Sequence, residues 1–467
     1  MNHRQRVRNA ASCIAIGSSL VASLLASSCA DVRRDVANRV DDTVDAITRS
    51  NTPKGPRDAA MITREPDLRV RISRQADSKR LEGPDRFVVR PASGTATAPA
   101  QKARTLAGPL TITSGERGVR TRDANGVETD WGFGLDIDIV ASDGTLDGAA
   151  EAPGESLQLE GRLIPGFITV RPAWSENAGR FDVIATMPVE SYLPGVLGKE
   201  LIRSWPRQAF EAQAVAARTY ALQERRRART EGRLIDVEDT TADQVFEGTS
   251  SLRVAVEATR ATRGWTLTDD GSFIRAYFSS QCGGRPASAA RAWTAGSPLP
   301  MNRVESLQGK PRQAYCQRSP LHRWTIERSA DDFHKRLRAW GRAKGRDLMA
   351  LTRVRSIEVR DRNEAGRPDT YSIVTDTGRE YAMAPEELRE AANWSVSGLE
   401  PITRENRFHS GDVEVIVRAD SVRIIGRGFG HGVGMCQWCA KGMADSGMDW
   451  RSMIEQFYPG VDVRKMY

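Results

Sequence analysis

The sequence has little of what several common classes of protein need. Over its 467 residues it shows no repeat of fixed period, so nothing indicates a repeat array. It also lacks an alternation of aromatic and basic residues, and its net charge of +8 therefore does not indicate nucleic-acid binding. A basic balance suits acidic partners such as anionic glycan or anionic lipid, but genome composition alone can produce it. We therefore expect no nucleic-acid partner.

Cysteine is scarce as well. Two of the six cysteines, Cys13 and Cys29, lie in the first thirty positions. The folded body keeps four, which are Cys282, Cys316, Cys436 and Cys439. The last two form a C-x-x-C pair, and the four together with His322 make a Cys/His set that is chemically suitable for zinc. In an exported protein the same thiols can instead pair as disulfides, or they can stay free and buried.

The apolar run near the N-terminus, from about Cys13 to Ala26, is too short to cross a bilayer as a mature anchor. Arginines precede it, so residues 1–29 have the layout of a signal peptide, and we expect the protein on the periplasmic or cell-envelope side. Small residues precede Cys29, and the segment resembles a lipoprotein signal that leaves Cys29 acylated and anchored in a membrane. Ala26 stands where a larger aliphatic residue is usual, and plain secretion is the alternative.

The next part of the chain changes from polar to alternating. Residues 30–60 are rich in Asp, Arg, Thr and Pro without a sustained period, which predicts a flexible linker. Asp67 to Ile72 alternates charged and apolar residues like a strand. From Gly108 to Ala185, short alternating runs are separated by Asp-Gly, Asn-Gly and Pro-Gly pairs, which predicts an antiparallel β region.

The periodicity becomes helical near Ser204. We expect Ser204 to cap a helix that has Pro206 in its first turn and that runs to about Arg229. These patterns predict an α+β fold, in which a β-rich N-terminal region packs with a long helix and a C-terminal glycine loop and helix. We place a core at residues 61–324 and 411–467, with an inserted α/β subdomain at 325–410.

Three motifs far apart in the sequence stand out. The first runs from Pro188 to Glu200 (PVESYLPGVLGKE) and continues in AQAVAARTY at 212–220. The second is DQVFEG at 243–248, followed by AYFSSQCGG at 276–284. The third is GRGFGHGVGMCQ at 426–437. In this order and at these separations, the motifs closely resemble the stage II sporulation protein D and amidase enhancer (SpoIID/LytB) family, from about residue 65 to the end.

The resemblance implies an exported protein that acts on peptidoglycan glycan strands. Some members of the family are lytic transglycosylases that cut strands already stripped of stem peptides, between MurNAc and GlcNAc, and leave a 1,6-anhydro-MurNAc end. Other relatives are known only as enhancers of an N-acetylmuramoyl-L-alanine amidase. The alternative is therefore a non-catalytic scaffold that binds the wall and an amidase partner.

Glu200 matches the family's catalytic glutamate. Ordinary glycosidases use two carboxyl groups, one as acid and one for water or as nucleophile. A lytic transglycosylase needs only one, because the muramyl 6-hydroxyl attacks its own anomeric carbon and the glutamate acts first as acid and then as base. Burial should raise the pKa of such a glutamate. The alternative is a loop carboxylate paired with Lys199 or Arg203. Glu190 is the weaker candidate, since its alternating context suggests a strand face.

The resemblance also implies a set of substrate-binding positions, which are Gln213, Arg218, Asp243, Gln244, Ser280, Gly283, His431 and Gln437. Arg218 could pair with the lactyl carboxylate of a peptide-free muramyl residue, or it could be a buried structural arginine. His431 projects from the glycine loop, where we expect it to bond to substrate or to Glu200. Gln437 opens a helix and either presents its amide to the glycan or bonds to backbone at the helix end.

No cofactor is required for this chemistry, although zinc is possible. Some family members bind zinc near the segment that corresponds to Ser280 to Gly284. The histidine expected just after the Tyr277 position is Phe278 in this chain, so the family's ligand set does not transfer directly. We expect the three motifs to meet in one cleft.

Overall fold

The computed structural model describes residues 64–83, 85–91, 103–115, 118–131, 137–141, 157–172, 179–241, 243–294 and 299–467. All of them belong to one compact unit, Asp58–Tyr467. The predicted signal peptide, the linker and Cys29 lie outside the described residues. The unit mixes helices with strands and begins with a β-rich region, which confirms the predicted α+β class.

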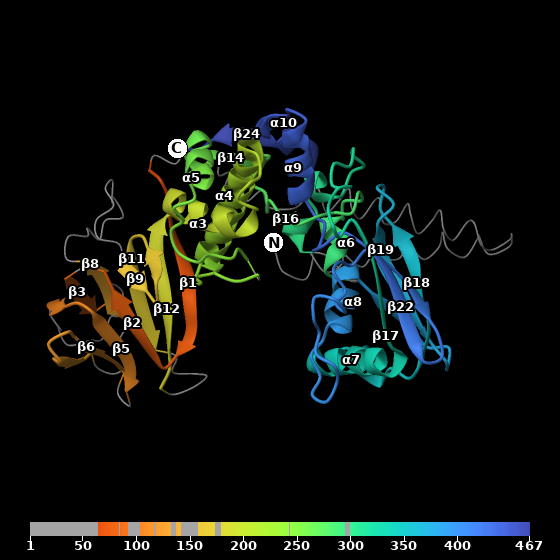
Figure 1. Ribbon diagram of the computed structural model, residues 1–467, viewed down its shortest axis with the longest axis horizontal. Coiled ribbons are helices and arrows are strands. Elements are labelled where there is room, and N and C mark those ends of the chain that lie inside the picture. Colours follow the sequence, from red (N-terminus) through yellow and green to blue (C-terminus); the bar gives the residue numbers. More distant parts are fainter. Residues whose placement is uncertain are drawn as a thin grey trace, which may run out of the picture. The chain divides into compact units, whose positions relative to one another are not determined.

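Two sheets form the β-rich N-terminal region (Figure 1, orange to yellow). The strands of the first are β1 Asp67–Ala76, β3 Arg86–Pro91, β4 Arg104–Ala107, β8 Ile137–Ala141, β11 Phe167–Pro172, β12 Phe181–Pro188 and β13 Val237–Glu238, in the order β13-β1-β12-β11-β8-β3-β4. The strands of the second are β2 Ser78–Glu82, β5 Leu110–Gly115, β6 Gly118–Arg122, β7 Glu128–Asp130, β9 Leu157–Leu159 and β10 Arg162–Ile164, in the order β10-β9-β2-β5-β6-β7.

Alternation along the strands explains why the two sheets share one core. In β1, Leu68, Val70 and Ile72 are buried, while the residues between them are partly exposed, as the sequence pattern predicts. Leu81 of β2 and Ile112 of β5 belong to the same hydrophobic cluster as these β1 residues. Strand β12 leads directly into the helix α3 (Val189–Glu200), whose Val189 and Tyr192 belong to the same cluster.

Helices follow the sheets. Their bounds are α3 Val189–Glu200, α4 Arg207–Thr230, α5 Arg253–Ala261, α6 Ala289–Ala292, α7 Ala330–Ala343, α8 Pro385–Ala392, α9 Gln437–Asp445 and α10 Trp450–Phe457, with 3-10 turns η1 Pro300–Asn302, η2 Glu305–Leu307 and η3 Asp347–Ala350. The long helix starts later than predicted, because Pro206 rather than Ser204 is its N-cap residue and no side chain caps it. A proline N-cap in extended conformation ends the preceding turn and lets the helix start at Arg207.

Two smaller sheets lie near the helices. One contains β14 Trp265–Asp269, β15 Ser272–Phe273 and β24 Asp462–Lys465, and the other pairs β16 Phe278–Ser279 with β23 Met435–Cys436. Both bring the last forty residues of the chain next to residues near 270. No helix in the described part of the chain is long and apolar enough to cross a membrane.

A further sheet occupies the segment that we predicted to be inserted. Its strands are β17 Arg323–Ser329, β18 Val354–Arg362, β19 Pro368–Thr375, β20 Glu380–Met383, β21 Val413–Val417 and β22 Ser421–Arg427, in the order β17-β22-β21-β18-β19-β20. The helices α7 and α8 pack with it, and the three elements share one hydrophobic core (Figure 1). The boundary predicted at residue 410 therefore runs through a sheet, because β21 and β22 complete it.

Candidate active site

Glu200 is the last residue of α3, and it is partly buried. Burial raises the pKa of its carboxyl, while a hydrogen bond from Gln437 acts in the opposite direction. The predicted alternative, a pair with Lys199, does not form, because Lys199 pairs with Glu247. Glu200 is thus a partly buried carboxyl group. In the described structure, no cation lies within hydrogen-bond distance of it.

Gln437 is the first residue of α9, as predicted, but its amide faces a side chain and not the backbone. Its Nε2 donates to Oε2 of Glu200 at 3.0 Å. The helix start is fixed just before it, where the thiol of Cys436 accepts a hydrogen bond of 3.4 Å from the Cys439 N–H. The N-terminus of α9 therefore positions the Gln437 amide beside the Glu200 carboxyl.

The second motif lies next to α9 as well. Strand β16 runs parallel to β23, with Phe278 opposite Met435 and Ser279 opposite Cys436. The Trp438 N–H donates to the carbonyl of Ser280 at 3.1 Å. The three sequence motifs therefore meet around the first turn of α9.

Two tryptophans that the sequence analysis did not single out lie close to this point. Trp205 and Trp438 contact each other edge to face, with ring centroids 5.2 Å apart. Trp205 comes five residues after Glu200, and Trp438 directly follows Gln437. The Ser204-Trp205-Pro206 sequence was the available signal, but only the fold shows that the two indoles meet. The contact ties the turn after α3 to α9.

For His431 we predicted a bond to substrate or to Glu200, and the described structure shows no hydrogen bond to Glu200. Its ring packs against Tyr277 and Trp293, and its Nδ1 accepts a hydrogen bond of 3.0 Å from the Val433 N–H. Burial lowers the pKa of His431 to about 4, so the ring is neutral near pH 7 and carries its proton on Nε2. None of the hydrogen bonds in the described structure joins His431 to Glu200.

Arg367, from the loop that opens β19, holds the glycine loop in place. Its guanidinium is fully buried and donates to the carbonyls of Cys282, Arg285 and His431 at 3.1–3.3 Å. A Cβ on Gly432, whose φ is +77°, would lie 2.5 Å from Nη1 of this arginine. Gly432 therefore leaves room for the arginine, a contact that nothing in the sequence indicates.

Arg218 is a structural residue. Its side chain is fully buried and forms a bidentate pair with Glu190, at 2.9 and 2.8 Å. Glu190 lies on α3 and not on a strand face, which corrects the interpretation of its alternating context. The pair joins two helices, so the structure favours the structural alternative for Arg218 over a contact with a substrate carboxylate.

Other predicted substrate-binding residues are also turned inward. Gln244 is fully buried and bonds to the Tyr192 hydroxyl and to the Ala217 carbonyl, while Asp243 accepts from the Tyr220 hydroxyl. Gln213 is fully buried too, although its amide has no hydrogen-bond partner in the described structure.

Gly283 has a structural role in the backbone. Its φ is +64°, and a Cβ there would lie 2.7 Å from Arg427. Of the positions predicted to bind substrate, Gln437 is therefore the one that a hydrogen bond joins to Glu200.

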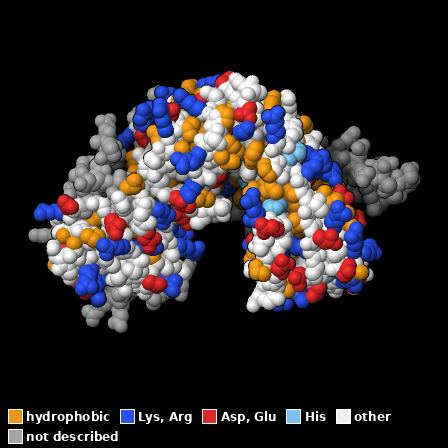
Figure 2. All heavy atoms as spheres, in the orientation of Figure 1, with side chains coloured by type: hydrophobic (Ala, Val, Ile, Leu, Met, Phe, Trp, Pro, Cys, Tyr) orange, Lys and Arg blue, Asp and Glu red, His pale blue; other side chains and the backbone are white. Residues whose placement is uncertain are grey.

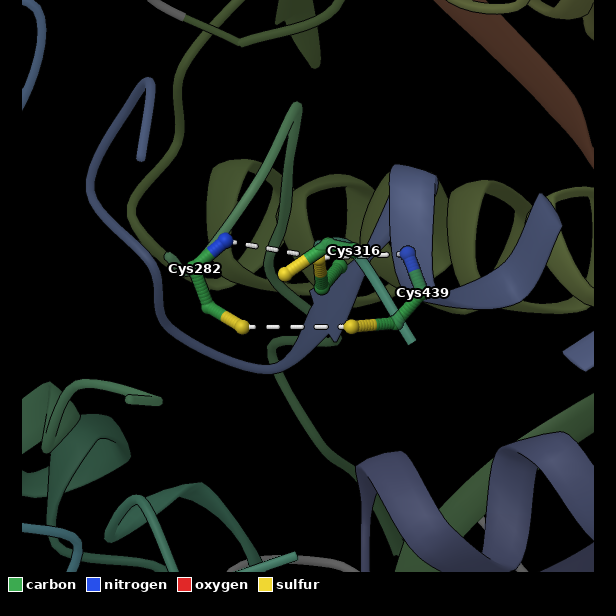
Figure 3. Close-up of side chains that lie close together, drawn as sticks. Cys282, Cys316 and Cys439 are labelled. Atoms are coloured by element: carbon green, nitrogen blue, oxygen red, sulfur yellow. Dashed lines mark hydrogen bonds between the residues drawn. The ribbon is translucent and has the colours of Figure 1, made fainter. Parts of the chain in front are cut away.

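The four cysteines of the folded body come together. Their sulfurs all lie within 4.8 Å of one another, and all four side chains are buried and free. Figure 3 shows Cys282 and Cys439 with their sulfurs facing each other, at 4.0 Å. A disulfide needs about 2.05 Å, whereas two ligands of a tetrahedral zinc with Zn–S bonds of about 2.3 Å lie about 3.8 Å apart. The geometry fits a four-cysteine metal site.

The pKa values of the clustered cysteines are shifted in opposite directions. Hydrogen bonds from the neighbouring thiols hold the pKa of Cys282 well below its usual range, while burial raises that of Cys436. A buried cluster of four cysteines favours only one ionised thiolate. Further thiolates become favourable only when a metal cation balances their negative charge. His322 stands just outside, with its Nδ1 3.7 Å from the sulfur of Cys316. The predicted ligand set included His322, but the four groups that converge in the structure are the cysteines.

Comparison with known proteins agrees with this geometry. Residues 177–268, which include Glu200 and the long helix, match the family model described as Stage II sporulation protein, SpoIID. Residues 177–268 are therefore similar to the SpoIID domain. This confirms the predicted family resemblance, and the match covers the first motif and the DQVFEG part of the second. Residues 300–434 match a second model, described as a domain of unknown function, DUF8618. That segment contains the sheet from β17 to β22 and ends just before Cys436.

This chain is also similar to several bacterial proteins. It is 29% identical over 287 residues to an uncharacterized protein of Brachyspira hyodysenteriae, covering 60% of this chain and 68% of that protein. It is 26% identical over 298 residues to the amidase enhancer of Bacillus subtilis, covering 58% and 40%. It is 26% identical over 296 residues to stage II sporulation protein D of the same organism, covering 60% and 75%. The match therefore spans less than half of the amidase enhancer.

Proposed function

We propose that this protein is a lytic transglycosylase of the bacterial cell wall, with Glu200 as its single acid and base. The observation that carries the proposal is the partly buried carboxyl of Glu200, with its raised pKa, held by the amide of Gln437. The relatives named for sporulation and for amidase enhancement support a role in wall remodelling, division or a sporulation-like process.

The chemistry follows from one carboxyl group. Protonated Glu200 donates its proton to the glycosidic oxygen between MurNAc and GlcNAc, and the bond to the anomeric carbon breaks. The resulting carboxylate then takes the proton of the muramyl 6-hydroxyl as that oxygen attacks the same carbon. The product is a 1,6-anhydro-MurNAc end.

The test is a digest of glycan strands stripped of stem peptides, analysed by mass spectrometry. The wild type should release anhydro-muramyl products, and Glu200→Gln should release none while keeping its fold and its binding to glycan. Glu247→Gln is the matched control, because Glu247 lies in the second motif and is exposed. If both variants cleave like the wild type, Glu200 is not the catalytic acid.

A non-catalytic role is the second candidate, and the similarity to an amidase enhancer favours it. In that case the protein binds the wall and recruits or activates an N-acetylmuramoyl-L-alanine amidase. Glu200→Gln would then leave the stimulation of a purified amidase unchanged, and no anhydro-muramyl end would appear with any variant.

We further propose that the four cysteines hold a structural zinc ion. Two of them belong to the segment that starts α9, so a bound zinc would fix the helix that presents Gln437. The ion itself takes no part in the proposed proton transfers.

The remaining proposals concern where the protein works. The N-terminal sequence supports export to the periplasmic or envelope side and anchoring through an acylated Cys29. Peptidoglycan glycan strands are the proposed partner, and an amidase is a further one. On the face shown in Figure 2, Lys and Arg side chains are interspersed with Asp and Glu, which gives no support to a nucleic-acid partner.

A further inference from the structure

Two arginines lie opposite each other on the strand pair β17 and β22. In this antiparallel register Arg323 is the direct partner of Arg427, so both side chains are on the same face of the sheet. Arg323 is exposed and Arg427 is partly exposed, and in the described structure neither guanidinium forms a hydrogen bond or an ion pair. Like charges directly opposite on a sheet repel each other. The pair therefore destabilises the free protein unless an anion joins it.

The charges around the pair do not supply that anion. Arg285 and Arg362 also lie close enough to act on Arg427, and Asp412 is the carboxylate among its neighbours. Burial and the surrounding guanidiniums lower the pKa of Arg427, which the carboxylate only partly offsets. Asp412 is fully buried, and both of its oxygens already accept from Arg285. Together with Arg323, four guanidiniums thus surround one carboxylate that is already paired.

The arginine pair lies where the second and third motifs meet. A Cβ on Gly283 would lie 2.7 Å from the Cβ of Arg427. Two residues further on, Phe429 exchanges two backbone hydrogen bonds of 2.9 and 3.0 Å with Gln281. The same segment continues to Gln437, whose amide bonds to the proposed acid. A polymer bound along these motifs can therefore bring an anionic group to the arginines.

Peptide-free glycan carries such a group. Removal of the stem peptide leaves a free carboxylate on the lactyl ether of each muramyl residue, and a guanidinium binds a carboxylate through two parallel hydrogen bonds. Arg218 was the arginine expected to bind it, but its guanidinium is buried against Glu190. The pair of Arg323 and Arg427 is reachable from solvent and has no carboxylate of its own.

We propose that Arg323 and Arg427 form a subsite for the lactyl carboxylate of a muramyl residue in a peptide-free strand. The choice of this carboxylate rests on the proposed function. The subsite favours stripped strands over strands that keep their stem peptides, because a lactyl group in amide linkage carries no charge. It thus supplies a physical basis for selecting the substrate.

The experiment measures the binding of peptide-free glycan to the full chain with Glu200→Gln, so that cleavage plays no part. Strands with free lactyl carboxylates are compared with the same strands after conversion of the carboxylates to methylamides. Arg323→Gln and Arg427→Gln should each weaken binding of the free-carboxylate strands by up to about tenfold, the equivalent of one hydrogen bond to a charged group. Neither variant should change the binding of the methylamide strands. Without glycan, both should melt at or above the temperature of the parent chain, because each relieves repulsion.

Arg423→Gln is the matched control on β22. Arg423 is exposed and lies opposite Glu327 instead of an arginine, so its loss should leave the binding of both kinds of strand unchanged. The proposal is overturned if the parent chain does not bind free-carboxylate strands, or if Arg323→Gln and Arg427→Gln bind them like the parent.

Two further results would also overturn it. One is an equal weakening of binding to the methylamide strands, which would show that the arginines do not contact the carboxylate. The other is tighter binding, dependent on Arg427, of inorganic phosphate or of phosphatidylglycerol vesicles than of the glycan. Arginine-dependent binding of glycan that the wild type does not cleave would contradict the proposed function alone.

Discussion

The side-chain amide of Gln437 donates a hydrogen bond of 3.0 Å to the carboxyl of Glu200, across 237 positions of sequence. Burial raises the pKa of this carboxyl, and the amide, by bonding to its charged form, pulls the pKa back down. The two effects together set the pH at which the proposed acid loses its proton. Gln437 is therefore a residue that tunes Glu200, whether or not it also touches the glycan.

Gln437→Met should shift the pH profile of cleavage. The variant keeps the length of the side chain but loses the donor, so the pKa of Glu200 rises further and the acid stays protonated to higher pH. The alkaline limb of kcat/KM should move up by as much as about one pH unit, the equivalent of one hydrogen bond. Gln456→Met, on α10, should leave the profile in place. A limb that moves to lower pH would contradict the role given to the amide.

Glu200→Gln should stabilise the protein near neutral pH. A carboxyl whose pKa is higher in the folded than in the unfolded protein makes its full contribution to folding stability below its unfolded pKa of about 4.3. That contribution is lost as the pH rises through the folded pKa. The neutral amide has no such loss. The melting temperature of the variant should thus exceed that of the wild type at pH 8, and the gap should close near pH 4. If the difference in melting temperature between the two proteins is constant from pH 4 to pH 8, the ionisation of Glu200 does not destabilise the folded protein.

Local patterns predicted much of the fold. The alternation in Asp67 to Ile72 and the turn pairs after Gly108 correctly indicated antiparallel sheets, because period-2 burial is visible in the residues themselves. The start of α4 was wrong by two residues, since Ser204 and Pro206 both suit a helix start and only the extended backbone at Pro206 decides between them. The predicted end of the inserted segment cut a sheet, because the pairing of Ile357 with Val415 and of Arg323 with Arg427 joins positions far apart in the sequence and has no local signal.

The candidate site was predicted less well than the fold. The motifs identified Glu200 and the four cysteines, whose residue types carry their chemistry. The family pattern cannot distinguish a residue that faces substrate from one that faces the core. Arg218 and Gln244 are in the second group, since Glu190 and Tyr192 reach them from α3.

Zinc analysis of the purified protein should give about one equivalent per chain. Cys436→Ser should lose most of the metal and lower the melting temperature, because it removes a thiolate ligand, while the serine hydroxyl can still accept from the Cys439 N–H. His322→Ala should keep the metal, since the four sulfurs alone complete a tetrahedral site. A protein without metal, whose mass shows the loss of four hydrogens, would instead establish two disulfides.

The buried pair of Arg218 and Glu190 should matter for stability and not for binding. Arg218→Met leaves a carboxylate without its partner in a place where only 9% of that side chain is exposed, and it should cost about 3–5 kcal/mol in urea unfolding. Adding Glu190→Gln removes the stranded charge, so the double variant should be more stable than the sum of the single changes predicts.

Measurements of activity distinguish this structural role of Arg218 from a role in binding substrate. If Arg218 supports only the packing of α3 on α4, the double variant should keep the KM of the wild type for peptide-free glycan wherever it is folded. If Arg218 held the lactyl carboxylate, KM would rise several-fold in Arg218→Met and in the double variant alike, and restoring stability through Glu190→Gln would not restore it. Unfolding curves and KM measured on the same three variants therefore separate the two roles, because the second substitution repairs the charge balance of the core and supplies nothing that could replace a guanidinium on the substrate.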